Sequence, residues 1–392
     1  MKALEGVGAV TREQWNRLVV PGQGPISHTF LSAWEHVILP GLQSRPLVAW
    51  DDEGQVPVAA TPACFYDLDP GGLKAGAPPL PLRALRRLRE DLLLLRIYEL
   101  GAPAALAFPL LHEAGMSAAD AARLLLPAAM EEAARAGAHV MVVQDFVAGE
   151  DGFDEVLEEA GFVPVPVLPT VMLELPFDSF DDYLARMRAP YRRRAHRALE
   201  QSRGLRVEHH HMFAPLAPEL ARLTRAVFDR AGEIRREILS EDYFRAASAA
   251  PDMSLLALRR SDGTIACFAL LLDDGPCLQF LNCGFELTAR EDGAYFRLLY
   301  ELVRLGIEKR YQRLNLGITT VPPKLDIGGV PVPLVAWIRY HRSPVQSLCA
   351  AVARRFLHHE VESPRRVFRT DSATDSAAVL VHPAAARLRR SA

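Results

Sequence analysis

Cysteine is scarce in this sequence and shows no pairing pattern. The chain has five cysteines, which are widely spaced and form no Cys-x-x-Cys motif: Cys64, Cys267, Cys277, Cys283 and Cys349. The odd count and the spacing argue against a disulfide framework. The first residues lack the charged and then apolar profile of a signal peptide, and no uncharged apolar run is long enough to span a bilayer. These absences predict a soluble cytoplasmic protein with reduced thiols.

Several catalytic and cofactor-binding motifs are also missing. There is no Gly-x-Ser-x-Gly elbow, no P-loop and no dinucleotide fingerprint. The run Glu208-His209-His210-His211 resembles a metal site, but alternation along a strand places adjacent histidines on opposite faces. No second group of ligands has suitable spacing for zinc. We therefore expect neither a bound metal nor a tightly bound cofactor.

Length and composition indicate an ordinary globular protein with two domains. A single hydrophobic core rarely holds 392 residues. The contents of 49% hydrophobic and 24% charged residues are typical of globular proteins. The net charge of -3 argues against affinity of the whole molecule for nucleic acids or membranes, so any contact with an anion must be local.

A dense arginine run in the middle of the chain is the obvious place for such a contact. Ser179, followed three residues later by Asp182, is a variant of the capping box and predicts the start of a helix. Six arginines follow between positions 186 and 197. A guanidinium donates hydrogen bonds in a fixed fork, which suits phosphate, whereas the alternative is a solvated helix face. The phosphate-binding candidates are Arg188, Arg192, Arg193 and Arg197.

The predicted elements have the same order in both halves of the chain: helix, β-hairpin, strand, helix, strand. In the first half we expect a helix over 11–40, strands over 46–50, 56–66 and 104–108, a helix over 117–136, a strand over 139–146, a helix over 153–159 and one or two strands over 163–175. After the arginine helix we expect a strand over 205–209, helices over 217–231 and 240–249, strands over 254–259, 265–272 and 277–285, a helix over 293–309 and a strand over 313–317. Residues 67–81 are expected to form an exposed flap, and residues beyond 345 a helix over 345–359 with a frayed tail. This order predicts α/β units with mixed sheets and crossover connections.

The arginine run and its surroundings resemble a known family. Ser179-Phe180-Asp181-Asp182-Tyr183-Leu184 and the arginines after it are similar to the signature of the predicted N-acyltransferases of the peptidoglycan biosynthesis and recognition family. These are relatives of the FemAB peptidyltransferases in the GNAT superfamily. The helix segment 30–35, the hairpin over 255–271 and the segment from 295 to Lys324 extend the resemblance to residues 11–345. It implies tandem GNAT-like domains, each with a mixed, mainly antiparallel sheet flanked by helices. The expected domains cover 1–175 and 176–345, with a C-terminal helix and tail over 346–392.

The resemblance also implies site residues. Lys324 corresponds to the family's lysine and would neutralise phosphate or developing negative charge. Thr319 and Thr320 stand where this chain departs from the family pattern; their hydroxyls are candidate hydrogen-bond donors to an oxyanion, and the alternative is that they are plain turn residues. Glu35 and Tyr295 are implied substrate contacts. The segment from Arg290 to Gly293 is similar to part of the GNAT pyrophosphate loop, at a predicted helix N-terminus, so these two residues are the cofactor-binding candidates. Two acids inside this loop and Tyr295 after it depart from the usual acetyl-CoA pattern.

The resulting prediction is an N-acyltransferase that moves an aminoacyl or acyl group directly to a primary amine of a small-molecule or cell-wall-type precursor. Aminoacyl-tRNA is the favoured donor, so tRNA is an expected partner. The alternative within this class is an acyl-CoA or an acyl-carrier protein as donor, in specialised-metabolite biosynthesis. The alternative of another class is a non-catalytic protein that recognises an anionic ligand.

Overall fold

The computed structural model describes residues 1–69, 94–101, 106–146, 152–230, 237–286, 293–340 and 363–369. The predicted helix over 345–359, most of the predicted flap and Arg290 lie outside these residues. Within them, none of the helices combines the length and the apolar composition that a membrane crossing requires.

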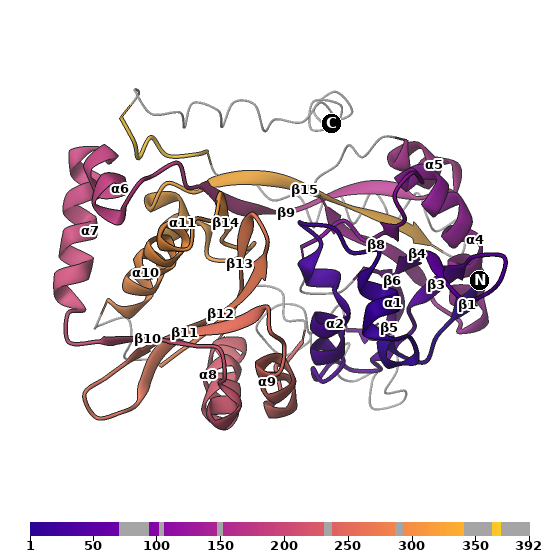
Figure 1. The fold of residues 1–392 in the computed structure, drawn as a ribbon, viewed down its shortest axis with the longest axis horizontal. Coiled ribbons are helices and arrows are strands. Elements are labelled where there is room, and N and C mark those ends of the chain that lie inside the picture. Colours follow the sequence, from indigo (N-terminus) through magenta and orange to yellow (C-terminus); the bar gives the residue numbers. More distant parts are fainter. Residues whose placement is uncertain are drawn as a thin grey trace, which may run out of the picture.

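A large twisted sheet runs through the molecule (Figure 1). The described part of this sheet has eleven strands, and all its neighbours are antiparallel except for two parallel pairs, β13–β14 and β6–β8. In spatial order the strands are β10 (Arg206–His210), β11 (Met253–Arg259), β12 (Ile265–Asp274), β13 (Cys277–Phe285), β14 (Arg313–Asn315), β9 (Val163–Glu174), β15 (Val330–Tyr340), β8 (Val140–Phe146), β6 (Leu95–Leu100), β5 (Ala63–Leu68) and β2 (Gln43–Ser44). A smaller sheet has the order β1 (Lys2–Ala3), β3 (Leu47–Trp50), β4 (Pro57–Thr61) and β7 (Leu111–His112).

The two halves of the chain exchange their last strands. β9, which ends the first half, pairs with β14 of the second half, where Met172 is opposite Asn315. β15, which was not predicted, pairs with β8 of the first half, where Val143 is opposite Trp337, and also with β9. The order of strands is therefore symmetric about the β9–β15 pair. The proposed boundaries at 175 and 345 separate units whose sheets are continuous with one another.

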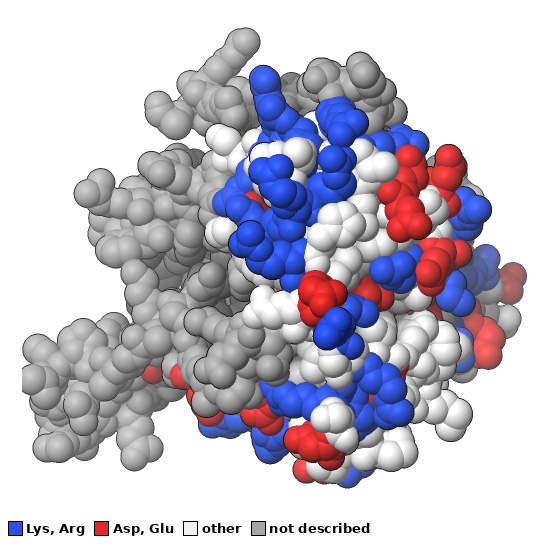
Figure 2. All heavy atoms as spheres, turned by 90° about the vertical axis from the view of Figure 1, so that its left-hand side faces the viewer, with Lys and Arg blue, Asp and Glu red and all other residues white. Residues whose placement is uncertain are grey.

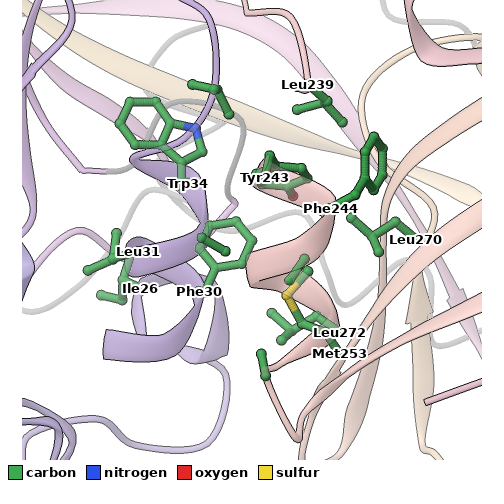
Figure 3. Packing of buried hydrophobic residues seen from close by; sticks show 14 of the residues in the cluster. Ile26, Phe30, Leu31, Trp34, Leu239, Tyr243, Phe244, Met253, Leu270 and Leu272 are labelled. Atoms are coloured by element: carbon green, nitrogen blue, oxygen red, sulfur yellow. The ribbon is translucent and has the colours of Figure 1, made fainter. Parts of the chain in front are cut away.

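Helices cover the sheet on both faces. On one face of β11, β12 and β13 lie α6 (Phe180–Arg186), α7 (Ala189–Gln201), α10 (Ala294–Glu308) and α11 (Val321–Asp326), and on the other α8 (Ala217–Arg230), α9 (Glu241–Ser248) and α2 (His28–Trp34). Figure 3 shows how α2 of the first half packs against α9, with Phe30 and Trp34 facing Tyr243. The helices α4 (Ala118–Arg135) and α5 (Phe153–Glu159) cover the sheet of the first half. Alternate residues of the central strands enter opposite clusters, which gives each face its own core.

Two predictions for the first half are wrong. The expected helix over 11–40 is broken into α1 (Arg12–Asn16), a 3₁₀ turn (Gly24–Ile26) and α2, because a segment with Pro21, two glycines and Pro25 cannot continue a helix. The strand expected near 104–108 is not present in its described part, 106–108; the strand of this region is β6.

The arginine segment is also two helices instead of one. The side chain of Ser179 accepts a hydrogen bond from the backbone N–H of Asp182, so the predicted cap starts α6. α6 ends at Arg186, and α7 begins at Ala189 with Pro190 in its first turn. Proline disfavours the helical conformation in the residue before it and cannot donate an N–H, so a helix cannot run through this position without loss.

Candidate active site

The parallel strands β13 and β14 separate in the second half of the sheet. They pair only from Cys277–Arg313 to Gln279–Asn315. Beyond this point the β14 segment bonds to β9, where Leu316 N–H donates to the Val171 carbonyl at 2.8 Å, while β13 continues along β12 to Phe285. From Phe280 onward β13 therefore has no strand partner on this side among the described residues.

Lys324 lies where the two strands separate. The residue is 2% exposed, and its Nζ donates to the carbonyl of Gly317 at 3.2 Å and to the carbonyl of Thr319. The ammonium also lies 5.8 Å from the centre of the Phe280 ring, as in a cation–π contact. The predicted catalytic lysine is thus a fixed positive charge at the opening of the sheet. It lies in the helix α11, although a loop was expected, because Pro322 and Pro323 occupy the first turn, where proline is tolerated.

The turn before α11 presents backbone groups to this lysine. Gly317 has a φ of +76°, and its N–H donates to the Asn315 side-chain oxygen at 3.0 Å; that oxygen also accepts from the Thr170 hydroxyl at 2.6 Å. Thr319 contributes its carbonyl to Lys324, and Thr320 is left-handed, with a φ of +53°. Both threonines are exposed, so their proposed role as oxyanion donors remains a prediction. Sequence reasoning missed Asn315.

The side of β13 that faces α10 and α11 carries residues that were not predicted from the sequence as part of the site. A bulge at Leu281 shifts the alternation, so that Phe280, Cys283 and Phe285 all face the cluster of α10 and α11. Burial raises the pKa of the Cys283 thiol to about 11, although the charge of Lys324 acts in the opposite direction. A nearby, half-buried thiol is therefore kept protonated at neutral pH.

The N-terminus of α10 lies at the far end of β13. Gly293 is the N-cap of this helix, with a φ of +66°, and Tyr295 follows in the first turn. The ring of Tyr295 lies 6.3 Å from that of Phe285. Phe280 and Phe285 are five positions apart on β13, which corresponds to a length of about 17 Å. The cofactor-binding candidate Gly293 and the substrate candidate Tyr295 thus lie at one end of this strand, and Lys324 at the other.

The arginines of the central segment differ in their roles. Arg192 donates to the carbonyls of Ala185 and Met187 at 3.3 and 3.2 Å, so it caps the end of α6. Arg194, which was not among the candidates, forms an ion pair with Asp326 of α11. The side chains of the remaining three candidates are exposed and have no hydrogen bond or ion pair with any described residue: Arg188, Arg193 and Arg197.

Arg193 and Arg197 point away from Lys324. α7 buries Ala195 and Ala198, and the 100° turn per residue places Arg193 and Arg197 on the opposite side of the helix. Figure 2 views the side of the molecule where α7 lies, and basic residues gather there. A helix with its side chains is about 10–12 Å thick, so a ligand that touches these arginines and Lys324 must be large.

Glu35 belongs to a different part of the molecule. Its side chain accepts a hydrogen bond from the Val7 N–H at 2.8 Å. α2, whose C-cap it is, packs with α9 on the face of the sheet opposite to α11. The structure therefore does not bring Glu35 together with Lys324.

The segment 363–369, from the predicted frayed tail, lies against the site helices. Val367 is 1% exposed, and Arg365 forms an ion pair with Asp326. This contact was difficult to predict, since only Val367 and Phe368 interrupt a polar, arginine-rich stretch.

Comparison with solved structures identifies the fold. FemX superposes with a TM-score of 0.56 at 14% sequence identity, over 89% of this chain and 100% of that chain. The chain has the FemX fold. The C-terminal domain of the protein named "Putative Lysylphosphatidylglycerol Synthetase" from Agrobacterium fabrum gives 0.52 at 14% identity, over 87% of this chain and 93% of the domain. The FemX-like architecture confirms the predicted fold class of tandem, mainly antiparallel α/β units.

Comparison of sequences covers only part of the chain and identifies no family. No model of a protein family matches the chain. A protein of Mycobacterium tuberculosis named "Putative 8-amino-7-oxononanoate synthase 2" is 28% identical over 220 residues, which are 54% of this chain and 28% of that protein. The chain thus matches little more than a quarter of the length of this curated relative.

Proposed function

We propose that the protein is an N-acyltransferase whose reaction takes place where β13 and β14 separate. The observation that carries the proposal is the buried Lys324 ammonium, fixed at this opening by the carbonyls of Gly317 and Thr319. The FemX fold supports the reaction class only by analogy, because one fold can host many functions.

In the proposed reaction, the amine of the acceptor attacks the carbonyl carbon of an activated acyl donor. The new C–N bond forms, the carbonyl oxygen becomes negative, and the C–O or C–S bond of the donor then breaks as a proton moves from the amine to the leaving group. Holding the two reactants together supplies about 7–11 kcal/mol of the barrier reduction. The charge of Lys324 stabilises the oxyanion. Direct transfer needs no nucleophile on the enzyme, and burial raises the pKa of the Cys283 thiol to about 11.

Aminoacyl-tRNA is the donor that the arginines favour. Arg188, Arg193 and Arg197 are exposed, and the last two lie on the far side of α7 from Lys324. A small phosphate-bearing ligand cannot reach both places, whereas a polyanion of the size of tRNA can. The acceptor is a primary amine of a small-molecule or cell-wall-type precursor.

One observation favours the second candidate, an acyl-CoA or an acyl-carrier protein as donor. The N-terminus of α10, with Gly293 as its cap, lies near the Phe285 end of β13, and Lys324 lies near Phe280, about 17 Å away along the strand; helix N-termini bind phosphate. An elongated donor with a phosphate at one end and a thioester at the other fits this distance. Both candidate donors therefore require Lys324 and a separate phosphate site, which is the arginines of α7 for tRNA and the N-terminus of α10 for the second candidate. An assay must decide between them.

The donor is tested by offering charged tRNA, acyl-CoA and acyl-carrier protein in parallel with a panel of primary amines. The tRNA proposal requires activity that ribonuclease abolishes. Lys324→Met should lower kcat by a factor of about 10²–10³ while the donor still binds, since removal of one oxyanion-stabilising group typically has this effect. Lys309→Met, at an exposed lysine, is the matched control. Unchanged turnover by Lys324→Met would remove Lys324 from the mechanism, and binding without turnover of any donor would favour a recognition protein.

The arginine contacts have a separate test in the salt dependence of tRNA binding. Each lost phosphate contact should reduce the slope of log K against log salt by about 0.7–0.9. The double variant Arg193→Ala and Arg197→Ala should therefore lose about 1.5 from this slope. The matched control replaces Arg123 and Arg135, exposed on α4, with Ala. Equal slopes for both double variants would contradict the proposed tRNA surface.

A further inference from the structure

The helix that carries Lys324, α11, is too short to be stable without contacts from the rest of the protein. α11 has six residues, Val321–Asp326, and its N-cap Thr320 provides no side-chain cap and lies in the left-handed region, with a φ of +53°. Helices this short do not persist alone in water, and a non-glycine residue in this region is conformationally strained. The place of Lys324 in the opening must therefore be set by contacts from outside α11.

Asp326 makes two of these contacts. Its side chain is only 10% exposed, and its two oxygens are used by different partners: Oδ1 accepts from Arg365 and Oδ2 from Arg194. Charge-assisted hydrogen bonds to a largely buried carboxylate are strong and directional. Asp326 is two residues from Lys324, so these bonds hold the end of the same short helix.

Arg365 is itself held by the segment 363–369. Phe368 pairs with Met187 in a β-bridge, Arg188 N–H donates to the Val367 carbonyl at 2.8 Å, and Arg369 N–H donates to the Arg186 carbonyl at 3.1 Å.

The ring of Phe368 packs against the turn that follows α11. It lies 5.3 Å from the ring of Phe177 and 5.7 Å from that of Tyr183. It also fills the space beside Gly328, where a Cβ atom would collide with it. The Tyr183 hydroxyl donates to the Ile327 carbonyl at 2.7 Å. The segment thus contacts both the end of α11 and the residues directly after it.

We propose that Asp326 is a positioning residue for Lys324, and that Arg365 of the segment 363–369, together with Arg194 of α7, keeps it in place. A segment far along the chain thereby completes the site without touching the reacting atoms. The importance of this positioning for turnover rests on the proposed function, but the position of Lys324 can be measured independently of any reaction.

Acetylation of lysines by N-hydroxysuccinimide acetate, followed by mass spectrometry, tests the proposal. The other lysines of the chain are Lys2, Lys74 and Lys309, and Lys2 and Lys309 are exposed and serve as internal standards. In the wild type we expect slow acetylation of Lys324. Asp326→Asn and Arg365→Ala should each raise its rate at least about tenfold relative to the standards, because local opening exposes the amine.

The matched control is Arg366→Ala, in the same segment, where the side chain is exposed and has no ion pair with a described residue. It should leave the rate unchanged, and Arg365→Lys should restore most of the protection lost in Arg365→Ala. Circular dichroism and thermal melting identify the folded variants. If Asp326→Asn does not fold, the labelling rate of Arg365→Ala tests the proposal by itself, because in that variant Asp326 still forms its ion pair with Arg194. Wild-type protection of Lys324 in the folded variants would overturn the proposal.

Turnover separates this proposal from the proposed function. With the donor identified by the parallel assay, Arg365→Ala should lower kcat about tenfold or more and leave KM within about twofold, as expected for a loss confined to the transition state. Increased labelling of Lys324 with unchanged kcat would uphold the positioning role and overturn the catalytic role of Lys324. Unchanged labelling with reduced kcat would overturn the positioning role alone.

Discussion

Cys283 offers a test of whether the proposed acyl transfer passes through a covalent intermediate. It lies on the part of β13 that has separated from β14, close enough to Lys324 to feel its charge. Burial nevertheless raises the pKa of its thiol to about 11. At pH 7 about one thiol in 10⁴ is then ionised, against about one in 30 for an unperturbed cysteine with a pKa of about 8.5. The attacking species is thus depleted roughly 300-fold.

The perturbation is Cys283→Ala, and we expect turnover to stay within about twofold of the wild type, because direct transfer needs no nucleophile on the enzyme. Iodoacetamide should alkylate Cys283 at pH 7 a few hundred times more slowly than a free cysteine, with a rate that rises about tenfold per pH unit. In Lys324→Met the loss of the nearby cation should raise the pKa of Cys283 further and slow alkylation again. Cys267, buried on β12 with a pKa well above its ordinary value, is an internal reference in the same digest.

Two results would refute this reasoning. One is an adduct of the mass of the acyl group on Cys283 when donor is added without acceptor, together with burst kinetics. The other is alkylation at the rate of a free cysteine, which would mean that burial does not control the thiol. The first result would require a two-step mechanism through Cys283, and the second would leave direct transfer in place but remove burial as the cause of the low reactivity of the thiol.

Two further predictions concern stability. His209 is exposed as a residue, but partial desolvation of its ring and the nearby charges of His211 and Lys309 lower its pKa from the ordinary value of 6.5. Its contribution to stability is therefore present above pH 6.5 and is lost as the pH falls through the lower folded-state pKa. Urea denaturation between pH 8 and 5 should show a smaller loss of stability for His209→Gln, and identical pH profiles would contradict this. Phe368→Ala should reduce the free energy of unfolding by about 2–4 kcal/mol, because the ring packs against two aromatic neighbours. Arg366→Ala should change it by less than about 0.5 kcal/mol, and an equal, small effect of both would mean that the segment does not dock.

Local features of the fold could be predicted from the sequence because their signals are local. Ser117 and Ser179 each accept a hydrogen bond from the N–H three residues on, as their capping patterns indicate, and the helices start where expected. The hairpin around Gly263, which has a φ of +89°, follows from the turn sequence and the apolar strands on either side.

Contacts between distant segments could not be predicted in this way. Neither β9 nor β15 carries a sign of the half with which it pairs, since both are apolar strands that fit any neighbour in a buried sheet. β15 was not predicted; Gly328 and Gly329 precede it and Pro331 and Pro333 lie within it, and both residue types are depleted in strands. The segment 363–369 was taken for a frayed tail, because a stretch with two apolar residues gives no periodic signal.

The candidate site also combines a local feature that could be predicted with distant contacts that could not. The sequence placed Lys324 near the end of a strand, and the structure brings it to the opening between β13 and β14. The sequence could not distinguish the arginine that pairs with Asp326 from those that face solvent, because the difference lies in the rotation of α7 against α11. Nor could it reveal Asp326 as a partner, since one acid after a lysine has no distinctive spacing.

The two halves of the sheet differ at the position of the candidate site. Each half contains one parallel pair, β6–β8 and β13–β14, where neighbouring strands can separate. In the first half Gly101 follows β6 with a φ of +115°, and the side chain of Gln144 fills the space beside it, so that any Cβ there would collide. In the second half the corresponding region holds the ammonium of Lys324.

The exchange of strands connects the helix of Lys324 to the sheet of the first half. β15 begins at Val330, directly after α11, and runs between β9 and β8 into the sheet of the first half. From the other side, the segment 363–369 fixes Asp326 against α6 and α7. Because α11 is too short to be stable alone, Lys324 depends on both attachments. In the first half the side chain of Gln144 occupies the space beside Gly101, and no lysine lies there among the described residues. The first half contributes to the candidate site through β8, which pairs with β15, the strand that follows α11.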